Sequence, residues 1–186
     1  MGSSSPAFHY FASPKKRDRN RRVIYTFQER SVVDPMIDVL DGPSLDMSCE
    51  RRRTSTVPTQ AFALFNSRFA HDQALAFAVR LDREAANPRD RIARAFRLVY
   101  GRNPKERELA MALDALTRLE AQHRNSPPPS KPQRNPAVEA ITASEQQNAA
   151  VAYEENIHPS DVTPETRALA DVALVLLNSN EFVYIY

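Results

Sequence analysis

The stretch TPETRALADVALVLLNS (residues 163–179) decides the fold that this sequence predicts. Its first three residues, Thr-Pro-Glu, supply a capping hydroxyl, a proline at the first helical position and an acid in the first turn, which together mark a helix start. The helix that follows is apolar nearly all round from Ala168 to Leu177. A helix of this kind belongs in the centre of a helical bundle.

The end of this stretch repeats an earlier phrase. AFALFNS occupies residues 61–67, and ALVLLNS occupies residues 173–179. We interpret both as buried helices that end at an Asn in the left-handed conformation. The Ser that follows is then available to cap the next element of the chain. The helices ending at Asn66 and Asn178 are therefore expected to form the buried centre of the bundle, side by side.

Other helices are marked by their first residues. Asn87-Pro88 and Asn103-Pro104 each combine an Asn cap with a Pro at the first helical position. An apolar stripe predicts a helix over 68–84, and an alternating run at 23–27 predicts extended structure. Three Gly and no Trp accompany 14 Pro, which favours helices over hairpins. The predicted fold is all-α, an irregular bundle of about five to six helices.

Composition also predicts how the chain is divided. Residues 1–21 mix Ser, Pro, Lys and Arg without periodicity, which predicts a disordered basic arm. Residues 22–186 are expected to form a single helical domain closed by its own C-terminus. Within it, a Pro-rich stretch and a segment poor in large apolar residues predict a flexible insertion at about 124–162.

Charge and targeting features narrow the possible classes of protein. A net charge of +2 with a pI of about 8.8 is too weak to imply a polyanionic partner by itself. The apolar segment 168–177 is about half the ~20 residues that a membrane-spanning helix needs, so no membrane span is expected. No secretion signal is visible, and the compartment stays open because a single Cys excludes only an internal disulfide.

Cys49 is the candidate reactive thiol. It lies beside Arg51, Arg52 and Arg53, and neighbouring cations favour the thiolate. The alternative, which we favour, is a small packing residue. A c-type haem needs Cys-x-x-Cys-His, so no bound haem is expected, and the four His lack the spacing of a metal site. We assign no catalytic, metal or cofactor-binding residue.

The triple Arg has a structural interpretation as well. A guanidinium placed before a buried helix can satisfy backbone carbonyls or pair with a carboxylate such as Asp46 or Glu181. Gln60, among apolar neighbours, is interpreted as a core amide with satisfied hydrogen bonds. Together with Asn66 and Asn178, these are the candidate structural or interaction residues.

Basic segments support a different alternative. The run at 15–22 and the Arg-hydroxyl cluster at 51–56 can neutralise phosphates, and Tyr25 and Phe27 can stack on bases if they are exposed. Acids are interleaved throughout the chain, so we do not expect nucleic acid as the main partner.

Several motifs in order resemble one known family. They are RVIYTF at 22–27, CERR at 49–52, Ser55-Thr56, Gln60-Ala61 with Asn66, and LLNSNEFVY at 176–184. Together they resemble the planctomycete-type domain of unknown function 1553, from about Arg22 to Tyr184 apart from the Pro-rich insertion. The resemblance implies the C-terminal part of large, usually exported or cell-envelope proteins, behind another uncharacterised domain and often with a cytochrome-c-like domain.

Three functional hypotheses follow. The first is a non-catalytic helical module that packs against other domains or partner proteins in a larger assembly. The second is a fragment of a multidomain enzyme, in which Cys49, the Arg cluster, Gln60 and Asn66 line part of a cleft. The third is weak nucleic-acid binding through the basic arm. The sequence favours the first, because no catalytic constellation is visible in it.

Overall fold

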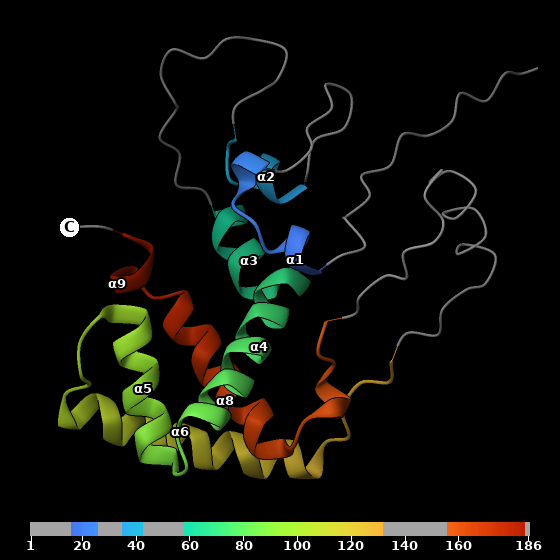
Figure 1. Ribbon diagram of the computed structural model, residues 1–186. Coiled ribbons are helices and arrows are strands. Elements are labelled where there is room, and N and C mark those ends of the chain that lie inside the picture. The colour runs from blue at the N-terminus through green and yellow to red at the C-terminus, as the bar shows by residue number, and fades with distance from the viewer. Residues whose placement is uncertain (1–15, 26–34, 43–57, 132–155, 185–186) are drawn as a thin grey trace, which may run out of the picture. The chain divides into compact units, whose positions relative to one another are not determined.

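The computed structural model is mainly helical in the residues that it describes, 16–25, 35–42, 58–131 and 156–184 (Figure 1). These residues include no strand, and five of their helices have nine residues or more. The all-α prediction is confirmed. None of the described helices combines the length and the apolar content that crossing a membrane requires.

The chain separates into two compact units, which we describe one at a time. The first unit comprises Met1–Ala63 and Arg134–Asn156, and the second comprises Leu64–Gln133 and Ile157–Tyr186.

The first unit contains short helical elements. They are α1 (Lys16–Arg19), the 3-10 helix η1 (Val23–Tyr25), α2 (Pro35–Val39) and most of α3 (Pro58–Asn66). The run at 23–27, predicted as extended, instead begins with η1, in which Tyr25 N donates to Arg22 O at 2.9 Å. The described residues offer this short run no strand to pair with, so it gains little from extension there and the local turn prevails.

The second unit is a bundle of five helices, one of which is central, counted over the described residues. The helices are α4 (Arg68–Glu84), α5 (Pro88–Tyr100), α6 (Glu106–Asn125), α8 (Pro164–Leu177) and α9 (Asn180–Val183), with the 3-10 helix η2 (Pro159–Asp161) before α8. α8 contacts α4, α5 and α6, and Figure 1 shows it in red against green α4.

The core of this unit forms around α8, as its sequence predicts. Nine of the fourteen residues of α8 are buried. The largest side chains that are fully buried come from three different helices and are Leu81, Ile92 and Leu169. The prediction of a central helix at the C-terminal end is therefore confirmed.

Helix caps follow the sequence signals in most places. Asn87 accepts a hydrogen bond from Asp90 N at 2.9 Å, and Gly101 ends α5 with φ 72. Asn103, however, is not a cap, because α6 begins at Glu106. There the side chain of Glu108 accepts from Lys105 N at 2.7 Å. The capping bond at this helix start therefore comes from an acid in the first turn and not from Asn103.

The repeated phrase behaves differently in its two copies. Ser67 and Ser179 cap α4 and α9, as predicted. Asn178 is not left-handed, since its φ is −105 and its Nδ2 donates to Leu174 O at 2.8 Å. Asp41 is the non-glycine residue with positive φ among the described residues, so the left-handed prediction is wrong for Asn66 as well. α3 also has no buried residue, and the prediction that it shares the buried centre is wrong.

Candidate interaction surface

Arg102 follows the glycine that ends α5 and uses all five of its N–H groups. Its Nη1 and Nη2 donate to the two oxygens of Glu108 at 2.8 Å each. Its Nε and Nη2 donate to the two oxygens of Glu181 at 2.6 and 2.8 Å. The remaining N–H donates to Asn103 O at 3.2 Å. One guanidinium thus joins the start of α6 to α9.

The electrostatics of this cluster follow from these bonds. Hydrogen bonds from Arg102, and then from the backbone N of Lys105, lower the pKa of Glu108 to about 2. Arg102 likewise lowers the pKa of Glu181, and the two carboxylates raise the pKa of Arg102. Isolated surface ion pairs contribute little to stability, but bidentate pairs that share one guanidinium form a network with fixed geometry.

Aromatic rings support the same guanidinium. Phe96 and Tyr100 pack edge to face with centroids 5.2 Å apart, and the Arg102 Cζ lies 5.7 and 5.5 Å from their ring centroids. The Tyr100 hydroxyl donates to Ser179 Oγ at 2.8 Å, and Ser179 Oγ donates to Leu176 O at 2.8 Å. Burial raises the pKa of Tyr100 further above neutrality, so the phenol stays protonated and a donor to a higher pH than an exposed tyrosine.

Large apolar side chains are exposed at this end of the second unit. We call five of them the apolar surface, each between 45% and 60% exposed: Phe69, Val175, Phe182, Val183 and Tyr184. The start of α4 lies beside the end of α8, because Ala70 of α4 and Leu177 of α8 pack against one cluster formed by Ala74, Ala173 and Leu174. The surface therefore joins the first turn of α4, the last turn of α8 and α9.

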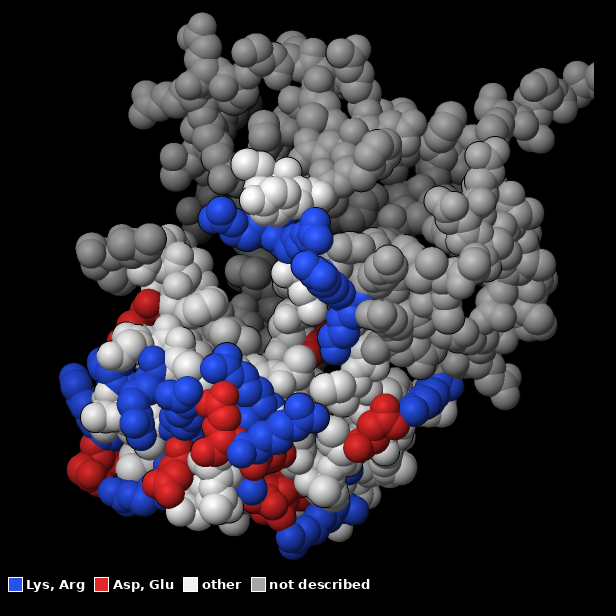
Figure 2. Space-filling model, viewed as in Figure 1, with Lys and Arg blue, Asp and Glu red and all other residues white. Residues whose placement is uncertain are grey.

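Charged side chains near the apolar surface are paired with one another. Arg102 and Glu181 form the cluster described above, and Arg68 Nε lies 3.8 Å from Asp72 Oδ2. Figure 2 shows the same pattern more widely, with basic and acidic side chains next to each other on the face in view. The apolar surface is thus bordered by charges that cancel locally.

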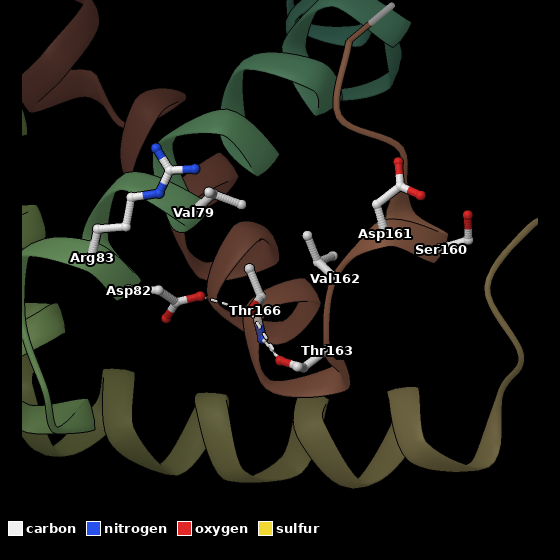
Figure 3. Close-up of a pocket in the computed structure, with 8 residues that line it drawn as sticks. All are labelled: Val79, Asp82, Arg83, Ser160, Asp161, Val162, Thr163 and Thr166. Carbon is white, nitrogen blue, oxygen red and sulfur yellow. Dashed lines mark hydrogen bonds between the residues drawn. The ribbon is translucent and has the colours of Figure 1, made fainter.

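A groove lies between α4 and the segment that leads into α8 (Figure 3). It has a volume of about 450 Å³ and is lined by eight residues: Val79, Asp82, Arg83, Ser160, Asp161, Val162, Thr163 and Thr166. Thr166 Oγ1 donates to Asp82 Oδ2 at 2.6 Å, and Asp82 Oδ1 lies 3.2 Å from Arg91 Nε. The first contact fastens the start of α8 to α4 and the second fastens α4 to α5, so both have a structural role.

Comparison with known proteins identifies the family. A family model described as protein of unknown function (DUF1553) matches residues 3–116, more than half of the chain. The chain belongs to the DUF1553 family. The matched residues include Arg102 and Glu108 and end before α8, so the motif at 176–184 lies beyond them. Neither the curated proteins nor the solved structures show a significant match.

Some residues that the sequence singled out in this DUF1553 protein lie outside the described residues. These are Cys49, Asp46, Arg51, Arg52 and Arg53. Their proposed roles stay predictions. Glu181, named as a possible partner of the triple Arg, has both carboxylate oxygens bound by Arg102.

The remaining candidates are in different places. Gln60 Nε2 donates to Asp41 Oδ2 at 2.8 Å, so its amide is hydrogen-bonded, but it lies on a helix without buried residues and is not a core amide. Asn66 is the exposed last residue of α3. Asn178 and Glu181 lie near each other at the end of α8 and in α9.

Two histidines of this DUF1553 protein, His123 and His158, have structural partners. His123 Nε2 lies 2.6 Å from Asp171 Oδ2. His158 Nδ1 accepts from Ser160 N at 3.2 Å and so caps η2. Among the described residues, no three His, Cys, Asp or Glu side chains gather in a way that could hold a metal ion.

The residues that matter most at α9 were missed in the sequence. Arg102 and Glu108 come from a loop and a first helical turn, and each looks like a solvated surface charge when it is read alone. A usable signal was present: Arg directly after a helix-ending Gly, with a Glu six residues later in the next first turn. The third partner, Glu181, is 79 residues away, and no local pattern predicts it.

Proposed function

We propose that this DUF1553 chain is a non-catalytic helical module that packs against another folded protein domain in a larger assembly. The observation that carries the proposal is the apolar surface, five large apolar side chains grouped at one end of a well-packed unit. Val175 is the clearest member, because it is 60% exposed on a helix in which nine of the fourteen residues are buried. Such grouped exposure is typical of interaction sites.

The chemistry of this surface supports a protein partner. Three of its five side chains are aromatic, and aromatic residues are enriched in protein interfaces. Among the described residues, the neighbouring Arg68 and Arg102 are paired with Asp72 and Glu181, which leaves these two guanidinium groups less suited to a polyanion or an anionic membrane. A complementary apolar face on another domain is the occupant that fits these features.

The family resemblance supports a choice of partner. It implies a position behind another uncharacterised domain in large planctomycete proteins that often carry a cytochrome-c-like domain. We take that neighbouring domain as the partner, because domains of one chain meet at high effective concentration and need only modest apolar interfaces.

A binding experiment tests this proposal. The neighbouring domain would be produced separately and titrated into the full chain by isothermal calorimetry. We expect Phe69→Ser and Phe182→Ser each to weaken binding by about tenfold or more. Met111→Ser is the matched control, since Met111 is 62% exposed on α6 and faces away from the buried Leu109 and Leu116.

Two outcomes would contradict the proposal. One is the absence of binding between the wild-type chain and the neighbouring domain. The other is binding of the wild-type chain to vesicles that contain phosphatidylglycerol, with loss of that binding in Phe182→Ser, which would assign the surface to a membrane.

A further inference from the structure

α9 depends on its surroundings for its position. It has four residues, far fewer than the ~12 that an isolated helix needs to be even marginally stable in water. It contacts α5 and α8. Its apolar side chains Phe182 and Val183 are 47% and 45% exposed, so their burial alone does not fix the helix. The polar contacts must supply much of its orientation.

Two polar contacts reach α9 from the body of the unit. Tyr100 donates to Ser179 Oγ, which caps the first turn of α9 by accepting from Phe182 N at 3.3 Å. Arg102 holds both oxygens of Glu181, two residues further along. A single hydrogen bond leaves a short helix free to rotate about it. A second, bidentate contact removes that rotation because it defines a plane.

Arg102 is itself held firmly. Its other edge is bound by Glu108 and by Asn103 O, and its face lies over Phe96 and Tyr100. Lys at this position would keep the charge but could not form two bidentate pairs at once. The planar fork of Arg is therefore the property that matters.

We propose that Arg102 is a positioning residue, which sets the orientation of α9 and so the direction in which Phe182, Val183 and Tyr184 face. The consequence for partner binding rests on the proposed function. The effect on α9 itself does not, and it can be measured without a partner.

Hydrogen exchange measures that effect in the full chain. The backbone N–H groups of Val183 and Tyr184 donate to Ser179 O and Asn180 O at 3.0 Å, so they report on whether α9 is formed. In Arg102→Gln we expect exchange in residues 180–184 to become about tenfold faster or more. Arg102→Lys should give an intermediate rate. The control Arg118→Gln, which removes an exposed ion pair on α6, should leave the rate unchanged.

A second variant covers the case in which Arg102→Gln unfolds the unit. Glu181→Gln removes charge only on the α9 side and leaves the bonds between Arg102 and Glu108 in place. Exchange in α8 provides the internal reference for an intact core. Unchanged exchange at 180–184 in Arg102→Gln, or in Glu181→Gln if the first variant does not fold, overturns the inference.

Calorimetry with the neighbouring domain then separates this inference from the proposed function. Faster exchange together with weaker binding supports both. Faster exchange with unchanged binding supports the role of Arg102 in placing α9 and contradicts docking through α9.

Discussion

Arg167 Nη2 donates to the carbonyl oxygen of His123 at 2.8 Å, so a buried guanidinium on α8 closes the end of α6. Its Nη1 lies 3.4 Å from Ser126 O, beyond the last turn of the same helix. The final carbonyls of a helix have no partners within that helix. Here the central helix provides a donor, and the two helices are joined by polar as well as apolar contacts.

Arg167→Met should therefore destabilise the second unit. Methionine keeps the length and the apolar stem but leaves the His123 carbonyl without its charged donor. We expect a loss of about 1 kcal/mol, since part of the lost bonding is offset by not burying a charge. Urea unfolding followed by circular dichroism measures it. Arg118→Met, on an exposed pair, should change the free energy of unfolding by less than about 0.5 kcal/mol. Equal losses in both variants would contradict the capping role.

Thr166→Val tests the attachment of α8 to α4. Val has nearly the shape of Thr, but it cannot donate to Asp82 Oδ2, which accepts from Thr166 at 2.6 Å. Thr166 is buried, so an acceptor that loses its donor there should cost about 1–3 kcal/mol. Thermal unfolding measures the change. Thr117→Val is the matched control, because that hydroxyl donates to Leu113 O on an exposed face. A melting temperature of Thr166→Val equal to that of the control would show that the bond is not needed.

The central position of α8 could be predicted because a helix with apolar residues on every face buries them only when other helices surround it. The caps at Asn87, Gly101 and Ser179 could be predicted because they depend on residues within one turn of each other. α3 shows the limit of this reasoning. Its phrase matches that of α8 at four of seven positions, yet it has no buried residue, because burial depends on what surrounds a helix and not on its own composition.

The cluster around Arg102 shows a second limit. Its carboxylates come from positions 6 and 79 residues further along the chain, and only the nearer one lies in a recognisable cap. Charge patterns read along one helix predict partners three or four residues apart. Pairs formed across helices depend on the register of packing, which a single sequence does not specify.

Glu108 should make the stability of the second unit depend on pH in the acid range. Its pKa is lowered to about 2 in the folded protein, from the ordinary value of 4.5. A lowered pKa contributes stability that is present above the unfolded value and is lost as pH falls toward the folded value. The difference in unfolding free energy between wild type and Glu108→Gln should thus be largest near neutral pH and should shrink between about pH 4.5 and pH 2. Urea unfolding at several pH values measures this difference, and a constant difference across that range would contradict the assignment.

The backbone geometry of Asn178 predicts whether Asn178→Gly stabilises or destabilises the fold. If an Asn ends a helix in the left-handed conformation, Gly is the better residue there and Asn→Gly should stabilise. Asn178 has φ −105 instead, and its side chain binds Leu174 O. Asn178→Gly should therefore destabilise by about 1 kcal/mol, through the lost bond and the added freedom of the unfolded chain.

Gly101→Ala is the converse case, because Gly101 has φ 72 and a Cβ there would meet no atom within 4 Å. Its cost, about 1 kcal/mol, should come from the backbone alone. Thermal unfolding of both variants measures the two effects, and a rise in melting temperature for Asn178→Gly would restore the left-handed interpretation.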